Sequence, residues 1–228
     1  MIFNILKMKY KNIIFDFDGT LADTAELTIE TMHRTNEVLK LSRKSDEECR
    51  SMIGYRLEKI PSILWPDISD ISERYVATFR EIYKTTKDSF KIRTYPFVVE
   101  TLAVIEQRGI RMAVASSRSK ISLLELCSEL HLGKYFEMMV GGGDVENGKP
   151  AADAVNLILK IQGWNKDETL VVGDMNVDVL MGKAAGTDAC GVTYGNGSVA
   201  DLKEVGPDFI ISDFRELYNL LGLDIKCR

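Results

Sequence analysis

Short apolar runs alternate with segments of helical periodicity along the second half of the chain. The segments 121–130, 151–161 and 177–185 repeat apolar residues at helical spacing. Strand and helix in alternation are typical of a parallel, doubly wound sheet, so we predict an α/β fold. The apolar runs expected to form its strands are Ile13–Phe15, Arg111–Ala115, Met138–Val140, Leu170–Val172, Ala189–Val192 and Phe209–Ile211.

The first crossover of this sheet is much longer than one helix requires. Asp18 and Ser116 lie 98 positions apart, whereas an ordinary crossover needs only a dozen or more residues. Among the additional residues, the segments 25–39 and 71–82 each repeat apolar residues on one helical face. The segment Ser45–Glu48 has the form of a helix-capping box. We therefore predict an inserted α-helical domain at residues 22–95, between two segments of the core at 8–21 and 96–228.

Composition narrows the possible partners. Of the 228 residues, 45% are hydrophobic and 28% are charged, as in an ordinary soluble globular protein. The formal net charge of −5 provides no overall basic character for nucleic acid or anionic lipid. No apolar stretch approaches the roughly 20 residues that span a bilayer. We expect neither a nucleic acid nor a membrane as a partner, and the sequence carries no signal of oligomeric state.

The cysteines and the N-terminus indicate a cytoplasmic location. Cys49, Cys127, Cys190 and Cys227 show neither CxxC nor zinc-type spacing, which favours buried or incidental thiols in a reducing compartment. The first residues lack the apolar core and cleavage site of a signal peptide. Residues 1–7 precede the first expected strand, so we expect them to be dispensable.

The segment Asp16–Gly19 is the strongest candidate for chemistry. It places Asp16 and Asp18 at the carboxyl end of the first expected strand, where open α/β sheets bind ligands. Gly19 allows a sharp turn without a steric penalty. Burying paired acids is costly, so simple core packing explains them poorly. A solvated acidic loop is the alternative.

Two later segments provide groups that suit a phosphate. Ser116 and Ser117 follow the second expected strand, where hydroxyl and backbone N–H groups can donate to phosphoryl oxygens. A plain helix N-cap is the commoner role of such serines. Lys149 precedes Pro150 at the start of an expected helix, and its ammonium could offset the charge of a phosphate and a carboxylate together. Taken alone, this Lys is equally typical of a solvated loop.

Asp174 and Asp178 complete the pattern. Asp174 follows the expected strand that ends at Val172, and Asp178 lies one helical turn further on. Carboxylates in this arrangement suit Mg²⁺, although a helix dipole also favours acids at its N-terminus. Because the carboxyl ends of parallel strands share one edge, we expect all these groups to converge there.

The ordered set D-x-D-G-T, S, K-P and G-D-x-x-x-D resembles the haloacid dehalogenase superfamily of phosphotransferases. The insertion resembles that of its helical-cap subclass, which includes phosphoglycolate phosphatases. The resemblance implies a Rossmann-like core with a cap. It implies that Asp16 is the nucleophile and forms an aspartyl-phosphate, that Asp18 donates and then accepts a proton, and that Ser116 and Lys149 hold phosphoryl oxygens. It also implies that Mg²⁺ is bound by Asp16, the backbone carbonyl of Asp18 and Asp174, with Asp178 in support.

Departures from the family pattern refine this hypothesis. Asp18 argues against a dehalogenase, and Thr28 stands where related sugar-phosphate mutases carry a histidine. We therefore predict a Mg²⁺-dependent phosphate monoester hydrolase for a small phosphorylated metabolite such as phosphoglycolate. The alternatives are a pyrophosphatase, a sugar-phosphate phosphatase or mutase, and a non-catalytic phosphate-binding module. Expected substrate contacts are Gly19, Thr20, Ser117, Arg118 and Arg56, the last through a second anionic group on the substrate.

Overall fold

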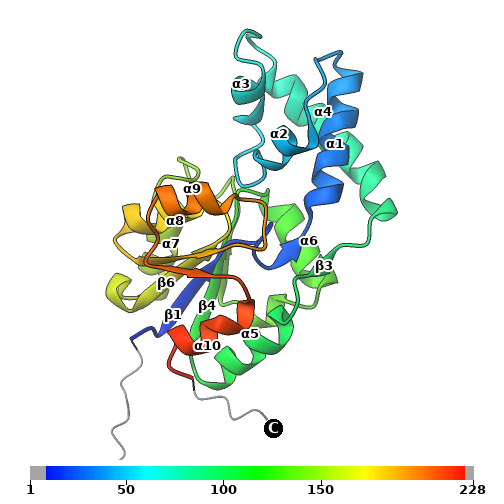
Figure 1. The fold of residues 1–228 in the computed structure, drawn as a ribbon. Helices are drawn as coiled ribbons and strands as arrows, with labels where there is room; N and C mark the ends of the chain where they lie inside the picture. The colour runs from blue at the N-terminus through cyan, green and yellow to red at the C-terminus, as the bar shows by residue number, and fades with distance from the viewer. Residues whose placement is uncertain (1–8, 224–228) are drawn as a thin grey trace, which may run out of the picture.

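A six-stranded parallel sheet in the order β5-β4-β1-β6-β7-β8 forms the centre of the molecule (Figure 1). The computed structural model describes residues 9–223; the expected start of the core at residue 8, residues 1–7 and Cys227 lie outside this range. The strands are β1 (Asn12–Phe15), β4 (Arg111–Ala115), β5 (Met138–Val140), β6 (Thr169–Gly173), β7 (Asp188–Val192) and β8 (Phe209–Ile211).

Helices cover both faces of this sheet. Ile13 and Phe15 of β1 pack in one cluster with residues of α5, α6 and α10, whereas Ile14 packs in another with residues of α7 and α8. Successive strand residues point to opposite faces, so a fully apolar strand supplies both layers. The helices of the core are α5 (Val98–Gln107), α6 (Lys120–Glu129), α7 (Asp153–Gln162), α8 (Asn176–Ala185), α9 (Val199–Glu204) and α10 (Leu217–Leu220).

The long first crossover folds as a separate group of helices beyond the carboxyl edge of the sheet (Figure 1). Its helices share an apolar cluster that includes Ala25, Met32, Cys49 and Tyr75. The capping box at Ser45 forms as expected, with Glu48 N donating to Ser45 Oγ at 3.1 Å. This helical insertion comprises α1 (Ala25–Val38), α2 (Asp46–Arg50), α3 (Ile60–Leu64) and α4 (Ser72–Thr86), and the paired strands β2 (Ala22–Asp23) and β3 (Arg93–Thr94) join it to the core.

The predicted strands agree with the observed ones to within a residue at each end, but one helix begins later than expected. The helix expected from Ala151 is α7, which begins at Asp153. The N–H of Ala151 donates to the carbonyl of Gly148 and closes a tight turn first. This turn contains Lys149, so the later start of the helix occurs at a predicted site residue. Short 3₁₀ turns occupy Lys87–Ser89, Gly133–Tyr135, Lys166–Glu168 and Phe214–Glu216.

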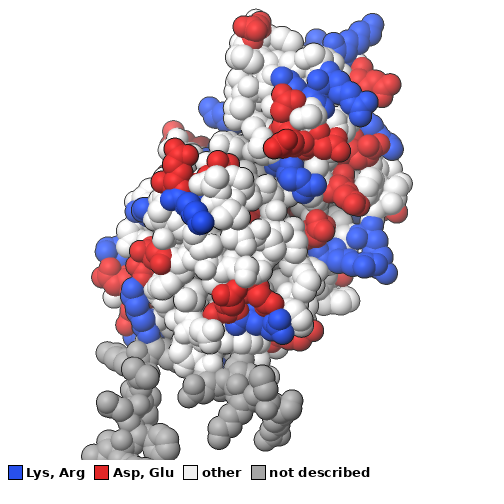
Figure 2. Space-filling view, viewed as in Figure 1, with Lys and Arg blue, Asp and Glu red and all other residues white. Residues whose placement is uncertain are grey.

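The surface and the thiols agree with the composition. Figure 2 shows acidic and basic side chains interspersed over the insertion and a largely uncharged face over the core. Cys49, Cys127 and Cys190 are buried free thiols. Within residues 9–223, no helix combines the length and the apolar character that crossing a membrane would require.

Candidate active site

Three of the predicted site residues follow neighbouring strands at one edge of the sheet. Asp16 comes directly after β1, Ser116 after β4 and Asp174 after β6, and β1 lies between the other two strands. The strand order reverses at β1, because the chain proceeds first to β4 and β5 and then returns to β6 on the other side. Ligand sites of open α/β sheets form outside such a switch point. The fold therefore gathers residues that are far apart in the sequence.

Asp16, Asp174 and Asp178 form a buried acidic cluster. Their exposed fractions are 3%, 0% and 0%, and one carboxylate oxygen from each lies within 4.8 Å of the others. Three carboxylates this close repel one another strongly in a buried setting. The cluster therefore needs positive charge to exist in ionised form.

Neutral donors hold Asp174 in place. The hydroxyl of Thr20 donates to its Oδ1 at 3.0 Å, and the backbone N–H of Asn196 donates to its Oδ2 at 2.7 Å. Gly19, with φ of +93°, approaches so closely that a Cβ there would lie 2.2 Å from Asp174 Oδ2. The glycine of the first motif is thus required both by its backbone conformation and by the position of Asp174.

Lys149 supplies the cation inside this cluster. Its ammonium donates to Asp16 Oδ1 and forms an ion pair with Asp178 at 2.7 Å, and its side chain is only 3% exposed. Burial disfavours the charged ammonium, but attraction to Asp16 and Asp178 outweighs this effect and raises the pKa of Lys149. One ammonium therefore serves two carboxylates, whereas the donors to Asp174 are neutral.

The remaining negative charge suits a divalent cation. Burial, then repulsion from Asp178, raises the pKa of Asp174 to about 7, and burial also raises the pKa of Asp16 despite the attraction of Lys149. Asp16 Oδ2 is buried without a hydrogen-bond partner among the described residues. Mg²⁺ prefers carboxylate oxygens as ligands, and Asp16 Oδ2 is an acceptor that no described donor uses. Asp16, Asp174 and Asp178 are the side chains that could hold it.

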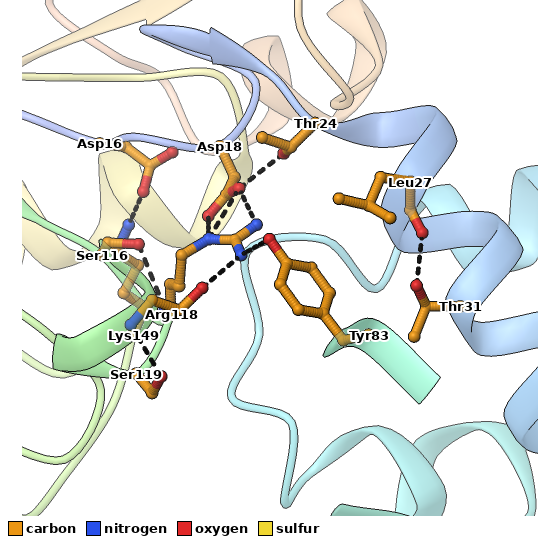
Figure 3. A network of polar contacts seen from close by, with 11 residues as sticks. Asp16, Asp18, Thr24, Leu27, Thr31, Tyr83, Ser116, Arg118, Ser119 and Lys149 are labelled. Carbon is orange, nitrogen blue, oxygen red and sulfur yellow. Dashed lines mark hydrogen bonds and ion pairs between the residues drawn. The ribbon is translucent and has the colours of Figure 1, made fainter. Parts of the chain in front are cut away.

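Asp18 has a different environment from the other acids (Figure 3). Arg118 donates to it from Nε at 3.2 and 3.1 Å and from a terminal nitrogen at 2.6 Å, and the hydroxyl of Thr24 donates at 2.6 Å. Burial alone would raise the pKa of Asp18, but Arg118 and Thr24 together lower it. Asp18 is therefore held as an oriented carboxylate beside the cluster. Its expected metal ligand is the backbone carbonyl, a role that stays a prediction.

Ser116 follows β4 at the edge of the sheet that carries the acidic cluster. Its Oγ accepts a hydrogen bond from the backbone N–H of Arg118 at 3.1 Å, which leaves the hydroxyl proton available. Ser117 behaves differently, because its hydroxyl donates to the carbonyl of Gly54 in the insertion at 2.6 Å. A contact of the Ser116 hydroxyl with a phosphoryl oxygen stays a prediction, whereas Ser117 links the core to the insertion.

Arg56 has partners other than the expected substrate anion. Its two terminal nitrogens donate to the backbone carbonyls of Val145 and Glu146, each at 2.7 Å. These carbonyls lie in the core loop that leads to Lys149, and a Cβ at Gly148 would meet Arg56 Nε at 2.5 Å. In this structure, Arg56 therefore ties the insertion to the core.

Three residues near the site are absent from the residues predicted from the sequence. Thr24 and Tyr83 both bond to the Asp18–Arg118 pair, and Asn196 supports Asp174. Thr24 could have been noticed as a hydroxyl close to the first motif. Tyr83 lies inside the insertion and Asn196 follows β7, so only the folded chain brings either of them to the site.

A family model described as haloacid dehalogenase-like hydrolase matches residues 13–192. The chain belongs to this family. Pyrophosphatase PpaX of Bacillus pumilus is 30% identical over 93% of this chain and 96% of its own length. A phosphoglycolate phosphatase of Pseudomonas fluorescens is 28% identical over 90% of this chain and 77% of its own.

A solved haloacid dehalogenase-like hydrolase from Bacteroides fragilis superposes with a TM-score of 0.83, at 28% identity, and covers 92% of this chain and 100% of its own. The resemblance inferred from the four motifs and the predicted α/β fold are thereby confirmed. The prediction that the chain is a phosphatase agrees with the names of its sequence relatives in this hydrolase family.

Proposed function

We propose that this haloacid dehalogenase-like hydrolase is a Mg²⁺-dependent phosphate monoester hydrolase that acts on a small phosphorylated metabolite. The observation that carries the proposal is the arrangement of Asp16. One of its oxygens is held by Lys149, and the other is buried without a hydrogen-bond partner among the described residues. Lys149 holds the carboxylate in place without using its second oxygen, so Asp16 could contact both a cation and phosphorus.

Mg²⁺ would be held by Asp16, Asp174 and the backbone carbonyl of Asp18, with Asp178 close by. When bound, it offsets repulsion between the Asp16 carboxylate and a phosphate dianion and stabilises charge on the phosphoryl oxygens. Lys149 adds a positive charge beside Asp16, and the hydroxyl of Ser116 can donate to a phosphoryl oxygen. Lys149 already contacts Asp16, so this pair would need little reorganisation at the moment of reaction.

The reaction would proceed in two displacements. An oxygen of Asp16 bonds to phosphorus while the ester P–O bond breaks, and the departing oxygen takes a proton from Asp18. This step needs Asp18 in its protonated form, which burial favours and the hydrogen bonds from Arg118 and Thr24 oppose by lowering its pKa. Water then attacks phosphorus and passes a proton to Asp18, and the bond to Asp16 breaks to release phosphate. Splitting one difficult displacement into two easier ones is the advantage of covalent catalysis.

The relatives suggest two substrates to test first. Phosphoglycolate and pyrophosphate are the compounds in the names of the relatives at 28% and 30% identity. Both carry a second anionic group, and Gly19, Thr20, Ser117 and Arg118 are the predicted substrate neighbours. A sugar-phosphate phosphatase or mutase and a non-catalytic module remain the alternative hypotheses. A cytoplasmic location remains a prediction from the sequence.

The decisive experiment is a phosphate-release screen of phosphoglycolate, pyrophosphate and sugar phosphates with Mg²⁺, performed on the native chain and on Asp16→Asn. We expect the substitution to lower kcat at least about a thousandfold, because it removes the nucleophile. Asp23→Asn is the matched control, since Asp23 is an exposed acid outside the cluster, and it should retain activity.

Comparable turnover by Asp16→Asn would refute the assigned nucleophile. Conversion of a sugar phosphate without phosphate release would support a mutase. Binding of phosphate without turnover of any compound would support a non-catalytic module.

A further inference from the structure

Arg118 bridges two regions that meet beside the site. Its Nε and one terminal nitrogen donate to Asp18, and its other terminal nitrogen donates to Tyr83 at 2.9 Å (Figure 3). The same terminal nitrogen also donates to Ser122 at 3.0 Å. Asp18 and Ser122 belong to the core, whereas Tyr83 belongs to α4 of the insertion. A single guanidinium therefore connects an acid of the site to the helical insertion.

The planar shape of the guanidinium makes this connection directional. Its donors form a rigid fork, so fixing one edge fixes the direction of the opposite edge. Tyr83 and Ser122 fix the edge that faces away from Asp18. The Arg118 and Asp18 side chains are each 11% exposed, so water competes little for these bonds.

Tyr83 is itself anchored in the insertion. Its ring stacks on Phe79 with 6.2 Å between centroids, and Phe79 stacks on Tyr75 at 6.4 Å within the apolar cluster of the insertion. The guanidinium carbon of Arg118 lies 5.5 Å from the centroid of the Tyr83 ring. Any displacement of α4 relative to the core would therefore displace the hydroxyl that Arg118 contacts.

We propose that Tyr83 is a positioning residue for the reaction, which holds Arg118 against Asp18 only while the insertion covers the site. The inference rests on the proposed function, in which the Asp18 carboxylate takes a proton from the attacking water in the second displacement. Withdrawal of the insertion leaves Arg118 with Ser122 at that edge and removes the Tyr83 hydroxyl. The Asp18 carboxylate is then less firmly oriented, and a complete site depends on the covered state.

Tyr83→Phe tests this, because it keeps the ring stack and removes only the hydroxyl. Tyr75→Phe is the matched control on the same helix, since the Tyr75 hydroxyl is buried without a hydrogen-bond partner among the described residues. For Tyr83→Phe we expect kcat to fall roughly tenfold with KM changed less than about twofold, as for an interaction that matters mainly in the transition state. Tyr75→Phe should change neither value.

A second measurement is independent of activity. Nuclear magnetic resonance measures the exchange of the Arg118 guanidinium protons with water, and the loss of their signal in Arg118→Lys assigns it. This exchange should become at least about tenfold faster in Tyr83→Phe and stay unchanged in Tyr75→Phe. Unchanged exchange in Tyr83→Phe, or equal effects of both substitutions, would overturn the proposal. If the native chain hydrolyses no phosphorylated compound, the proposed function fails, and the exchange comparison still decides whether Tyr83 positions Arg118.

Discussion

At the residue scale, the ammonium of Lys149 serves the carboxylates of Asp16 and Asp178, while the guanidinium of Arg118 serves Asp18. Asp174 receives hydrogen bonds from the neutral donors of Thr20 and Asn196. This unequal distribution separates the acids by environment: burial raises the pKa of Asp16, whereas Arg118 and Thr24 lower the pKa of Asp18 against the effect of burial. A nucleophilic Asp16 must be ionised, so its assigned role requires a cation beside it. The unequal distribution also leaves the cluster around Asp16 and Asp174 with excess negative charge in the absence of a metal.

This excess charge predicts a pH-dependent response to Mg²⁺. Burial raises the pKa of Asp16, and burial with repulsion from Asp178 raises the pKa of Asp174 to about 7. An acid whose pKa is higher in the folded state than in the unfolded state binds more protons in the folded state at any pH between these two pKa values. The free energy of unfolding of the metal-free chain therefore falls as the pH rises through about 4 to 7. Mg²⁺ requires the ionised acids, so its binding becomes more favourable over the same range.

Millimolar Mg²⁺ should therefore raise the Tm more at about pH 8 than at about pH 5.5, because a ligand that binds the folded state stabilises it according to its affinity. Differential scanning calorimetry with and without Mg²⁺ measures this difference. Asp174→Asn should reduce it at the higher pH. An equal rise in Tm at both pH values would contradict the assignment of the cluster as the metal site.

At the element scale, the site depends on how closely α8 packs against the sheet. Asp174 precedes α8 and Asp178 lies in its first turn. Gly182 allows the close approach, since a Cβ there would lie 2.9 Å from Val171 Cβ on β6 and 3.3 Å from Ala189 Cβ on β7. The glycine in the middle of this helix is thus explained by packing.

Gly182→Ala should destabilise the chain although alanine is the better helix former. Alanine gains roughly 1 kcal/mol in helix propensity, whereas overpacking costs about 1–3 kcal/mol, so we expect a net loss of about 1 kcal/mol. Because α8 must move, Mg²⁺ binding should weaken too. Urea denaturation and Mg²⁺ titration check both effects. Gly143→Ala is the control, because no described atom lies within 4 Å of a Cβ there; equal stability of the two variants would refute the packing argument.

At the scale of the whole molecule, the insertion contacts the core through polar bonds at separate points. Besides the Tyr83–Arg118 and Gly54–Ser117 bonds, Arg50 donates to Asn196 at 3.3 Å, and Arg56 donates to two carbonyls of the core. Polar contacts of this kind are expected between parts that move relative to each other. The covered state would exclude water around Asp16.

Arg56→Ala should loosen this covered state. We expect a larger radius of gyration in small-angle X-ray scattering and a fall in kcat/KM by a similar factor for every substrate, because the substitution removes hydrogen bonds to the core and none to a substrate. Arg80→Ala is the matched control, since Arg80 pairs with Glu58 inside the insertion at 3.4 Å. A rise in KM restricted to doubly anionic substrates would instead support the substrate contact predicted from the sequence.

Local patterns in the chain were sufficient to predict the strands, the order of the motifs and the identity of the acids. Apolar runs such as Met138–Val140 coincide with the observed strand because a strand covered by helices on both faces must be apolar throughout. Parallel strands then bring Asp16 and Asp174 to one edge, so their proximity followed from topology.

The partner of each charged side chain, by contrast, became clear only in the folded chain. Arg118 pairs with Asp18, and Arg56 binds backbone carbonyls, although both looked alike in the sequence as candidates for a substrate anion. Tyr83 reaches the site from a helix whose pattern showed only its apolar face. Local periodicity records which side of an element is buried, whereas contacts between elements depend on the distances and directions that arise when the whole chain packs.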